Sequence, residues 1–304
     1  MSNYLTIDVG GTNIKYALMT EDAEILDKGE VPTPMEGVEQ YLNTLISIYE
    51  KYKDRDPQAL AMSAPGKIDS KRGYFYTAGA LKYMNDTDLG ALLKDRLPIP
   101  FTAENDAKAA ALAEIWKGSM QGVENGCVIV LGTGIGGALI INGKLYRGST
   151  YAAGELSCVS TRLDKPYNTV NMWAIQNGVG TMVADYANRI GADPAEMNGR
   201  ILFDKANQGE YEAIAAIDLY CGGLATGIIS LQHIIDVDVI AIGGGISKQL
   251  LLMERLERKI EEMYAGLAGY LPATIPQLVP CQFGNDANMI GALYHYLYEI
   301  RNEG

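Results

Sequence analysis

The sequence predicts an α/β protein with two similar halves, and two observations support this fold class. First, YLTIDVGGTNIKYALM (4–19) and VIVLGTGIGGALII (128–141) share one pattern: an apolar run, a turn of glycine and threonine, and a second apolar run. These segments lie about 120 residues apart, which indicates a duplicated architecture. Second, both halves combine β-like runs with segments of helical periodicity, as α/β domains do.

Each shared pattern predicts a hairpin whose turn binds phosphate. In the first hairpin, Leu5, Ile7 and Val9 alternate with polar residues, and a similar alternation resumes after the turn. A glycine turn between strands lets a phosphate approach the backbone closely, because no Cβ intervenes. We therefore expect one phosphate turn in each half, the two facing each other across a ligand cleft.

A different interpretation of the second turn is a dinucleotide-binding site. Gly132, Gly134 and Gly137 spell G-x-G-x-x-G after an apolar run, and Glu155 lies near the position of the ribose-binding acid. That motif requires the glycines to open a helix. Here Asn142-Gly143 separates two short apolar runs, which is a strong hairpin signal. We expect strand, glycine turn and strand, and no dinucleotide site.

The remaining elements complete two α/β domains. In the first half we expect a third strand at 23–27 and an amphipathic helix at 37–53. We also expect a strand at 59–69 that ends in Ala-Pro-Gly, and a loop at the start of 102–118 that becomes an alanine-rich helix. In the second half we expect helices at 181–191, 212–235 and 248–265, and a buried strand running into three glycines at 238–248. A last helix at 285–300 is expected to cross back. By a composition shift, the domains are predicted to span 1–118 with 285–304, and 119–284.

Composition narrows the classes of partner and compartment. The 304 residues carry 25 basic and 37 acidic side chains, a formal charge of −12, which argues against nucleic acid and anionic membranes as main partners. The N-terminus has no basic segment and Asp8 interrupts its apolar run, so we expect no signal peptide. The uncharged stretch 125–143 is broken by glycines, and the four cysteines are scattered singly. The sequence predicts a cytoplasmic protein without disulfides or membrane spans.

Two charged residues flank the first turn and suit nucleotide binding. Asp8 ends the first strand, where a carboxylate can hold Mg²⁺ directly or through water. Its alternative role is to cap its own turn. Lys15 can neutralise phosphate, but a solvated lysine on the polar face of a strand is an equally good interpretation.

Asp106, in the segment Glu104-Asn105-Asp106, is the candidate general base. An aspartate before an alanine-rich helix is usually an N-cap, so this role alone explains its position. The neighbouring Asn105 and the phosphate turns on either side favour chemistry instead. A carboxylate can accept the proton of a sugar hydroxyl while an amide binds neighbouring hydroxyls.

In order, DVGGTNIK, SAPGKID, ENDAKAAALAE, GTGIGGALIINGKLYRGSTYAAGELS and VIAIGGGIS resemble the motifs of the ROK family of sugar kinases, along essentially the whole chain. The resemblance implies the actin/hexokinase-like ATPase fold, with two ribonuclease-H-like domains that bind ATP and sugar in the cleft between them. It implies phosphate contacts by Asp8, Gly10, Gly11, Thr12, Asn13, Gly132, Thr133 and Gly134, adenosine contacts by Gly243, Gly244 and Gly245, and sugar contacts by Pro65, Gly66, Asn105, Asp106 and Glu155. Asp106 takes the role of the base.

The chain departs from the family after Glu155. Many relatives continue with a histidine and a cysteine cluster that binds structural zinc, whereas this chain has Cys158 and no further cysteine nearby. Zinc needs about four N or S ligands, so we predict no zinc site. Met172 and Trp173 lie near the position of a sugar-binding glutamate. Trp173 either stacks on a second sugar ring or packs its helix onto the core.

The zinc-less pattern is most similar to bacterial β-glucoside kinases, which phosphorylate the 6-hydroxyl of the non-reducing glucose in disaccharides such as cellobiose. Alternative acceptors are glucose and N-acetylmannosamine. Other members of the family are sugar-sensing repressors, but the first turn begins at residue 8, which leaves no room for a DNA-binding segment before it. An actin-like scaffold is the third alternative, against which the Asn105-Asp106 pair argues. Family habit suggests a homodimer.

Overall fold

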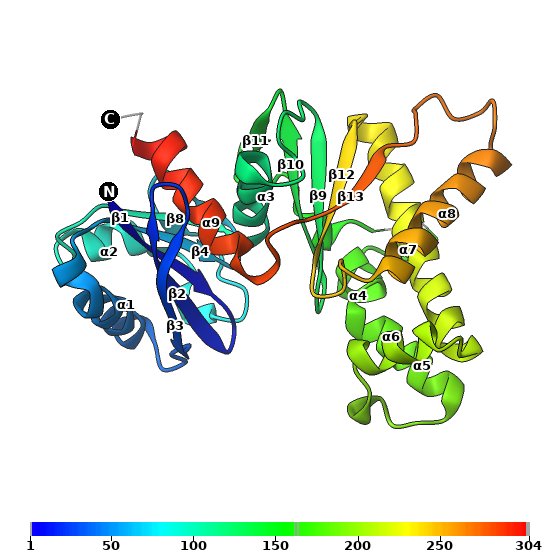
Figure 1. Cartoon of the computed structure of the whole chain (residues 1–304), viewed down its shortest axis with the longest axis horizontal. Helices are drawn as coiled ribbons and strands as arrows, with labels where there is room; N and C mark the ends of the chain where they lie inside the picture. Colours follow the sequence, from blue (N-terminus) through cyan, green and yellow to red (C-terminus); the bar gives the residue numbers. More distant parts are fainter. Residues whose placement is uncertain (1, 161, 163, 302–304) are drawn as a thin grey trace. The chain divides into compact units, whose positions relative to one another are not determined.

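The computed structural model describes residues 2–160, 162 and 164–301 (Figure 1). The chain forms two compact units. The first consists of Met1–Gln121, Arg147–Ala153 and Asn285–Gly304, and the second of Gly122–Tyr146 and Gly154–Gly284. Compared with the boundaries expected from composition, the first unit also takes residues 119–121 and the short segment 147–153.

The first unit is built on a five-stranded mixed sheet. Its strands are β1 (Asn3–Val9), β2 (Asn13–Thr20), β3 (Ile25–Pro32), β4 (Pro57–Ala64) and β8 (Phe101–Asn105), in the spatial order β3-β2-β1-β4-β8. The first three are antiparallel neighbours, whereas β4 and β8 run parallel to β1. A small antiparallel sheet of β5 (Ile68–Asp69), β6 (Tyr74–Phe75) and β7 (Thr87–Asp88) accompanies it.

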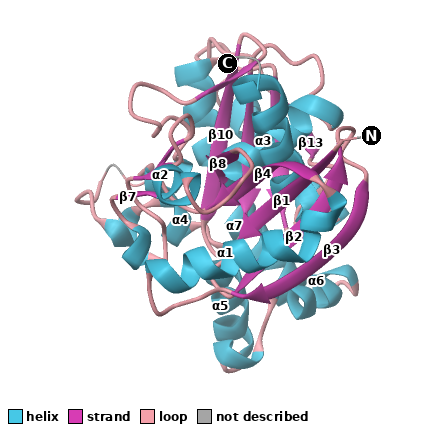
Figure 2. Ribbon diagram, turned by 90° about the vertical axis from the view of Figure 1, so that its left-hand side faces the viewer, coloured by secondary structure: helices cyan, strands magenta, loops and turns pink. Residues whose placement is uncertain are grey.

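Helices cover both faces of this sheet. The inward residues Leu5, Ile7 and Val9 of β1 share a core with Tyr41 and Leu45 of α1 (Val38–Tyr52), and α2 (Leu89–Lys94) adds to the same core. Figure 2 shows α1 beside the strands of this sheet. On the other side, α3 (Asp106–Lys117) packs against α9 (Ala287–Tyr294), which continues as a π-helix (His295–Ile300). The amphipathic helix predicted for 37–53 is therefore confirmed.

The second unit repeats the sheet of the first. Its strands are β9 (Gly126–Leu131), β10 (Ile135–Ile141), β11 (Lys144–Tyr146), β12 (Val239–Gly244) and β13 (Gln277–Pro280), in the order β11-β10-β9-β12-β13. Again three antiparallel neighbours are followed by two parallel strands. The duplicated architecture predicted from the two hairpins is confirmed, and so is the fold class.

The helices of the second unit are α4 (Trp173–Gln176), α5 (Val179–Ile190), α6 (Gly199–Asn207), α7 (Tyr211–Ile235) and α8 (Leu250–Gly266). Short 3₁₀ turns occupy Lys53–Arg55, Lys82–Met84, Leu156–Cys158, Thr169–Asn171, Pro194–Glu196 and Gly284–Asp286. By length and composition α7 resembles a membrane span, but half of its apolar window is buried and its residues share a core with β9 and β12. It is a core helix of this unit.

The structure corrects two predicted elements. The third strand, expected at 23–27, is β3 and spans Ile25–Pro32. Residues 102–105 were expected to form a loop before the alanine-rich helix, but they belong to β8, which pairs in parallel with β4. The polar side chains of this strand hid it, because Glu104 and Asn105 do not follow the apolar pattern of a buried strand. Both side chains are nonetheless buried, and both have hydrogen-bond partners inside the unit.

Candidate functional site

The first glycine turn joins β1 to β2. The Gly10 amide donates a hydrogen bond to the carbonyl oxygen of Asn13, 2.9 Å away, and the tip at Gly11 and Thr12 is exposed. Thr33 fastens the turn to the end of β3, because its hydroxyl donates to the Gly10 carbonyl and its amide donates to the Thr12 carbonyl. Sequence reasoning did not single out Thr33, which lies outside both glycine motifs.

Asp8 lies at the base of this turn. It is paired across the hairpin with Lys15, and its Oδ1 accepts a hydrogen bond of 2.9 Å from Asn288 at the start of α9. Burial raises the pKa of Asp8 and outweighs the opposing effects of Asn288 and Lys15. A divalent cation bound to the carboxylate would offset that cost by favouring its charged form.

The β8–α3 junction holds the candidate base. Asn105 is the N-cap of α3, because its Oδ1 accepts the amide hydrogen of Lys108 at 3.1 Å. Asp106 is the first helical residue, and its Oδ1 accepts hydrogen bonds from the Ala107 amide at 2.8 Å and from Nδ2 of Asn105 at 3.0 Å. Capping is therefore the task of Asn105, and Asp106 carries a carboxylate at the positive end of the helix dipole.

Gly66 meets this junction from the loop after β4. Its carbonyl oxygen accepts a second hydrogen bond from Nδ2 of Asn105, at 3.0 Å. The backbone of Gly66 has a φ of 108°, and a Cβ there would lie 2.0 Å from the carbonyl oxygen of Thr77. Only glycine fits this position. The structure thus brings together Gly66, Asn105 and Asp106, three of the residues expected to contact sugar.

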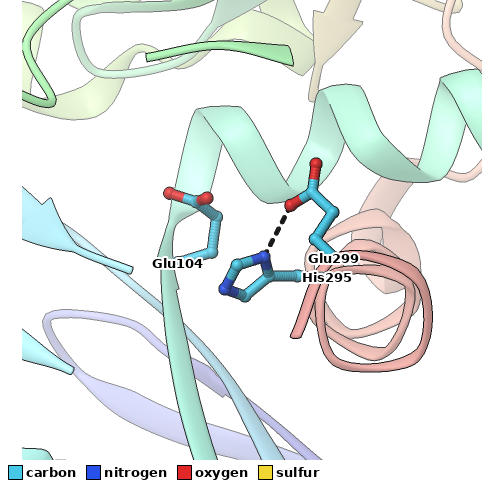
Figure 3. Close-up of side chains that lie close together, drawn as sticks. All are labelled: Glu104, His295 and Glu299. Atoms are coloured by element: carbon cyan, nitrogen blue, oxygen red, sulfur yellow. Dashed lines mark hydrogen bonds and ion pairs between the residues drawn. The ribbon is translucent and has the colours of Figure 1, made fainter. Parts of the chain in front are cut away.

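A buried ionic cluster lies directly behind the junction. Glu104, which is 1% exposed, accepts the Asn105 amide hydrogen through Oε1 and ion-pairs with Arg147 through Oε2, at 2.7 Å. Arg147 also bonds to Glu299, whose Oε2 lies 2.7 Å from Nδ1 of His295 (Figure 3). Burial alone would lower the pKa of Arg147, but the charges of the two glutamates raise it. We call Glu104, Arg147, His295 and Glu299 the Glu104 cluster.

The Glu104 cluster has the ligand types of a metal site. The ligand atoms of Glu104, His295 and Glu299 all lie within 4.8 Å of one another. The guanidinium of Arg147, however, already bonds to both carboxylates and supplies the positive charge there. These contacts define an ion-pair network that fixes β8 to the π-helix.

The second glycine turn joins β9 to β10, which pair as antiparallel neighbours. The prediction that these glycines connect two strands is therefore confirmed. The Gly132 amide donates to the Gly134 carbonyl at 3.0 Å, and the Gly132 carbonyl accepts the Val179 amide hydrogen at 2.9 Å. Val179 is the first residue of α5, so the N-terminus of a helix distant in sequence abuts the turn. Helix N-termini favour bound anions.

A pocket of about 420 Å³ opens beside this turn, within the range of small-molecule sites. Gly132, Thr133 and Gly245 line it, together with Val179–Gly180 and Asn198–Gly199. Much of its lining is apolar, from Leu131, Val183, Ala184, Pro194, Met197 and Ile246. An apolar pocket with a helix N-terminus and a glycine turn at its edge suits a nucleotide, and its helix residues were not predicted from the sequence.

The three consecutive glycines at the end of β12 have separate positions. Gly244 has a φ of 96°, and a Cβ there would lie 2.0 Å from the carbonyl oxygen of Leu131 on the neighbouring strand. Gly245 lines the pocket, and a Cβ there would meet no atom within 4 Å. Gly134, Gly243 and Gly244 are not among the described residues that line the pocket.

Glu155 and Cys158 frame a 3₁₀ turn in the second unit. Glu155 is exposed, and its Oε1 accepts a 2.5 Å hydrogen bond from the hydroxyl of Ser157. Cys158 is exposed and free, with its Sγ 3.5 Å from the same hydroxyl. Glu155 thus presents a carboxylate at the surface of its unit.

Trp173 is part of the core, and this overturns the idea that it stacks on a sugar ring. Its side chain is 0% exposed and packs on α7 at Gly227, where an added Cβ would lie 2.2 Å from the indole ring. The alternative interpretation, a tryptophan that packs its helix onto the core, is the one that the structure supports.

The fold and its two glycine turns define an actin/hexokinase-like α/β protein with a nucleotide-sized pocket. The chain belongs to the ROK family, whose model matches residues 4–298. The resemblance seen in the motifs is therefore confirmed.

Three similar proteins illustrate the range of the family. The chain is 30% identical to a β-glucoside kinase of Klebsiella pneumoniae over 292 residues, which cover 95% of this chain and 94% of that protein. It is similar to a ROK family protein of Streptococcus pneumoniae solved in complex with sucrose, at 31% identity and a TM-score of 0.86, covering 99% of this chain and 100% of the other. A Streptomyces griseus glucokinase solved with glucose and AMPPNP shares the fold, at 24% identity and a TM-score of 0.81, covering 96% and 98%.

Proposed function

We propose that this protein phosphorylates the 6-hydroxyl of the non-reducing glucose of a β-glucoside such as cellobiose, with Asp106 as general base. Its class is not in question, because the chain is a ROK-family sugar kinase, an ATP:sugar phosphotransferase. The proposal concerns the acceptor, the residues that carry out the transfer, and the metal.

The geometry of the β8–α3 junction carries the assignment of the base. Asn105 performs the capping, so Asp106 is not needed as the N-cap of α3. In the proposed step, a carboxylate oxygen of Asp106 takes the proton of the sugar hydroxyl. The hydroxyl oxygen then forms a bond to the γ-phosphorus as the bond from that phosphorus to the bridging oxygen breaks, and ADP leaves.

The proposed sugar contacts are those that the family resemblance implies. Both hydrogens of the Asn105 amide nitrogen are used by the Gly66 carbonyl and by Asp106, which hold the side chain in place. Its Oδ1, which caps α3, is proposed to accept a further hydrogen bond from a neighbouring sugar hydroxyl. Pro65 and Gly66 supply the backbone of the sugar-side loop, and Glu155 is the contact assigned to the second unit.

For the nucleotide, the proposal uses the pocket beside the second turn. Its apolar lining suits an adenine ring, and Gly132, Thr133 and Gly245 lie in that lining. From the family resemblance, Gly243–Gly245 are proposed to contact the adenosine and Gly132–Gly134 the phosphates. Gly10–Asn13 and Lys15 are proposed to contact the phosphates from the first unit. Asp8 fits Mg²⁺ because its carboxylate is buried beside the first turn, and the cation would neutralise charge on the phosphates during transfer.

The β-glucoside acceptor is favoured by the full-length similarity to the Klebsiella pneumoniae β-glucoside kinase and by the disaccharide held by the Streptococcus pneumoniae protein. Glucose or N-acetylmannosamine is the alternative acceptor. We further propose that the protein works in the cytoplasm, from its composition, and that it forms a homodimer, from family habit. We also propose that it holds no structural zinc, because the cysteine cluster found in many relatives is missing after Glu155.

An acceptor panel tests the proposal. The purified protein is supplied with ATP and Mg²⁺, and ADP release is measured with cellobiose, gentiobiose, glucose, N-acetylmannosamine and N-acetylglucosamine. We expect the highest kcat/KM for a disaccharide, with phosphorus-coupled NMR placing the new phosphate on C6 of the non-reducing ring. A higher kcat/KM for a free monosaccharide would replace the β-glucoside assignment with the alternative.

A further inference from the structure

We propose that Tyr76 and Tyr151, with Tyr74 beside them, form a subsite that holds the second sugar ring of a disaccharide acceptor. We call these three residues the tyrosine shelf. The inference rests on the proposed function, because it names the part of the first unit that recognises a β-glucoside as distinct from free glucose.

The shelf is a cluster of neighbouring aromatic rings. The planes of Tyr74 and Tyr76 are inclined by 60°, edge to face, and Arg72 lies over the Tyr74 ring. The ring centroids of Tyr74 and Tyr76 lie 5.0 Å apart, and those of Tyr76 and Tyr151 lie 6.4 Å apart with the planes inclined by 31°. All three side chains are only partly buried. Lys67 adds a positive charge 4.4 Å from the centroid of the Tyr76 ring. Partly exposed aromatic rings of this kind offer flat apolar faces, and their polar edges suit hydroxylated ligands.

Tyr151 is held in place from both of its ends. Its hydroxyl shares a hydrogen bond with Asp69, which together with burial raises the pKa of Tyr151 to about 12. Its carbonyl oxygen accepts a hydrogen bond of 3.1 Å from Nζ of Lys108. Its backbone has a φ of 62°, a conformation that bulky residues rarely adopt and that persists only where the surroundings enforce it.

The segment that carries Tyr151 is fixed to the first unit by its own contacts. In sequence, Arg147–Ala153 lies between β11 and the 3₁₀ turn Leu156–Cys158, which both belong to the second unit. The segment itself belongs to the first unit. Arg147 ties its start to Glu104, and the Ala153 amide closes it by donating to the Arg147 carbonyl at 3.2 Å. The segment is thus fixed to the same strand that ends at Asn105.

The shelf lies next to the proposed sugar contacts. The Lys67 amide donates to the hydroxyl of Thr77, and the Tyr76 amide donates to the Lys67 carbonyl. Gly66, whose carbonyl binds Asn105, precedes Lys67 directly. On the other side, Lys108 lies two residues after Asp106 and binds Tyr151. Short hydrogen-bonded links therefore connect both aromatic residues to the candidate base.

This placement fits a second pyranose ring. A disaccharide extends one ring beyond the phosphorylated glucose, and the apolar face of that ring packs favourably on an aromatic surface. Trp173 is buried and does not offer such a surface. The Streptococcus pneumoniae relative, which holds sucrose, establishes that a protein of this fold accommodates a disaccharide.

The test compares Tyr76→Ala with Tyr76→Phe, which keeps the ring. A matched control is Tyr211→Ala, at a side chain of the second unit that is 76% exposed. For each protein, kcat/KM is measured with cellobiose and glucose, and the affinity for both sugars is measured by calorimetry with AMPPNP present. We expect Tyr76→Ala to lower the cellobiose-to-glucose ratio about three- to tenfold in both measurements, and Tyr76→Phe and Tyr211→Ala to keep it.

The outcomes separate this inference from the proposed function. If the unaltered protein prefers cellobiose and Tyr76→Ala leaves the ratio unchanged, the shelf is overturned and the β-glucoside acceptor stands. If the unaltered protein binds cellobiose no more tightly than glucose, the shelf holds no second ring and the acceptor assignment falls with it. A similar fall of the cellobiose-to-glucose ratio in Tyr211→Ala would also overturn the shelf, because the effect would then not be specific to Tyr76.

Discussion

Nδ2 of Asn105 donates hydrogen bonds to Oδ1 of Asp106 and to the carbonyl oxygen of Gly66, both at 3.0 Å. One amide thus ties the candidate base to the sugar-side loop, while its oxygen caps α3. The arrangement combines a structural and a functional task in Asn105, and the two are separable by experiment.

Asn105→Ala tests that separation. The change removes the cap of α3 and is expected to cost about 0.5–2 kcal/mol of stability, and also to lower kcat/KM for the sugar by at least about tenfold. The control is Asp88→Ala, which removes the cap of α2 at the Ala91 amide, outside the proposed site. Chemical denaturation and ADP-release kinetics are compared. Equal losses of activity in the two variants would show that Asn105 acts only as a cap.

Gly245→Ala tests the nucleotide pocket. A Cβ at Gly245 would meet no protein atom within 4 Å, and Gly245 lines the pocket, so we expect the variant to keep the fold and to narrow the pocket. We expect KM for ATP to rise about tenfold while KM for the sugar stays constant, since a displaced contact of about 1.4 kcal/mol corresponds to that factor.

The neighbouring Gly244→Ala provides the contrast for that test. Its new Cβ would lie 2.0 Å from the Leu131 carbonyl, and its φ of 96° is strained for alanine. This variant should lose stability, which is measured by thermal unfolding. A normal KM for ATP in a folded Gly245→Ala protein would contradict the placement of the nucleotide.

Asp8→Asn should stabilise the protein at neutral pH while reducing activity. Because burial raises the pKa of Asp8 in the folded state, the unfolded chain releases this proton first as pH rises above 3.8. Ionisation of Asp8 therefore lowers the free energy of unfolding, and this loss of stability grows with pH until the pH exceeds the raised pKa of the folded state. The free energy of unfolding of the variant, relative to the unaltered protein, should increase with pH across this window.

Asp164→Asn is the control, because ionisation of Asp164 changes the free energy of unfolding in the opposite direction. The hydrogen bond from Arg162 lowers the pKa of Asp164, so its ionised form favours the folded state and is lost on substitution. Denaturation curves that extend below pH 3.8 distinguish the two trends: the effect of Asp164 is lost as the pH falls below that value and is constant above it, whereas the effect of Asp8 changes above it. If Asp8→Asn became relatively less stable as pH rises, the assigned burial cost of Asp8 would be wrong.

Glu104→Gln should be strongly destabilising. Glu104 is buried, and the substitution leaves Arg147 with one carboxylate partner fewer inside the unit. Breaking a buried pair by removing one partner costs about 3–5 kcal/mol. The matched surface variant is Glu39→Gln, at the exposed pair with Arg96, and it should change stability much less. Similar denaturation midpoints for the two variants would exclude a structural role for the Glu104 cluster.

The hairpins and the apolar helices were predictable because their signals are local. Asn142-Gly143 between apolar runs marks the β10–β11 turn, and the spacing of Tyr41, Leu42 and Leu45 marks the buried face of α1. The strand β8 was missed because its end is polar. Glu104 is acceptable in a buried strand only because Arg147, 43 residues later, neutralises it.

The parts of the candidate site that escaped prediction depend on contacts between distant segments. The N-terminus of α5 reaches the second glycine turn from 47 residues along the chain, as the Val179–Gly132 hydrogen bond records. Tyr151 meets Tyr76 only because Arg147–Ala153 returns to the first unit. No periodicity in the sequence encodes these encounters, whereas the family motifs pointed to Asn105 and Asp106.

The most direct test of the central claim is the steady-state kinetics of Asp106→Asn with ATP and the preferred sugar. We predict a fall in kcat of about 10²–10⁴ with little change in either KM, because the amide keeps the hydrogen bonds but cannot accept the proton. Its thermal unfolding should resemble that of the unaltered protein, since Asn105 retains the cap. Near-normal turnover in this folded variant would contradict the claim that Asp106 is the general base.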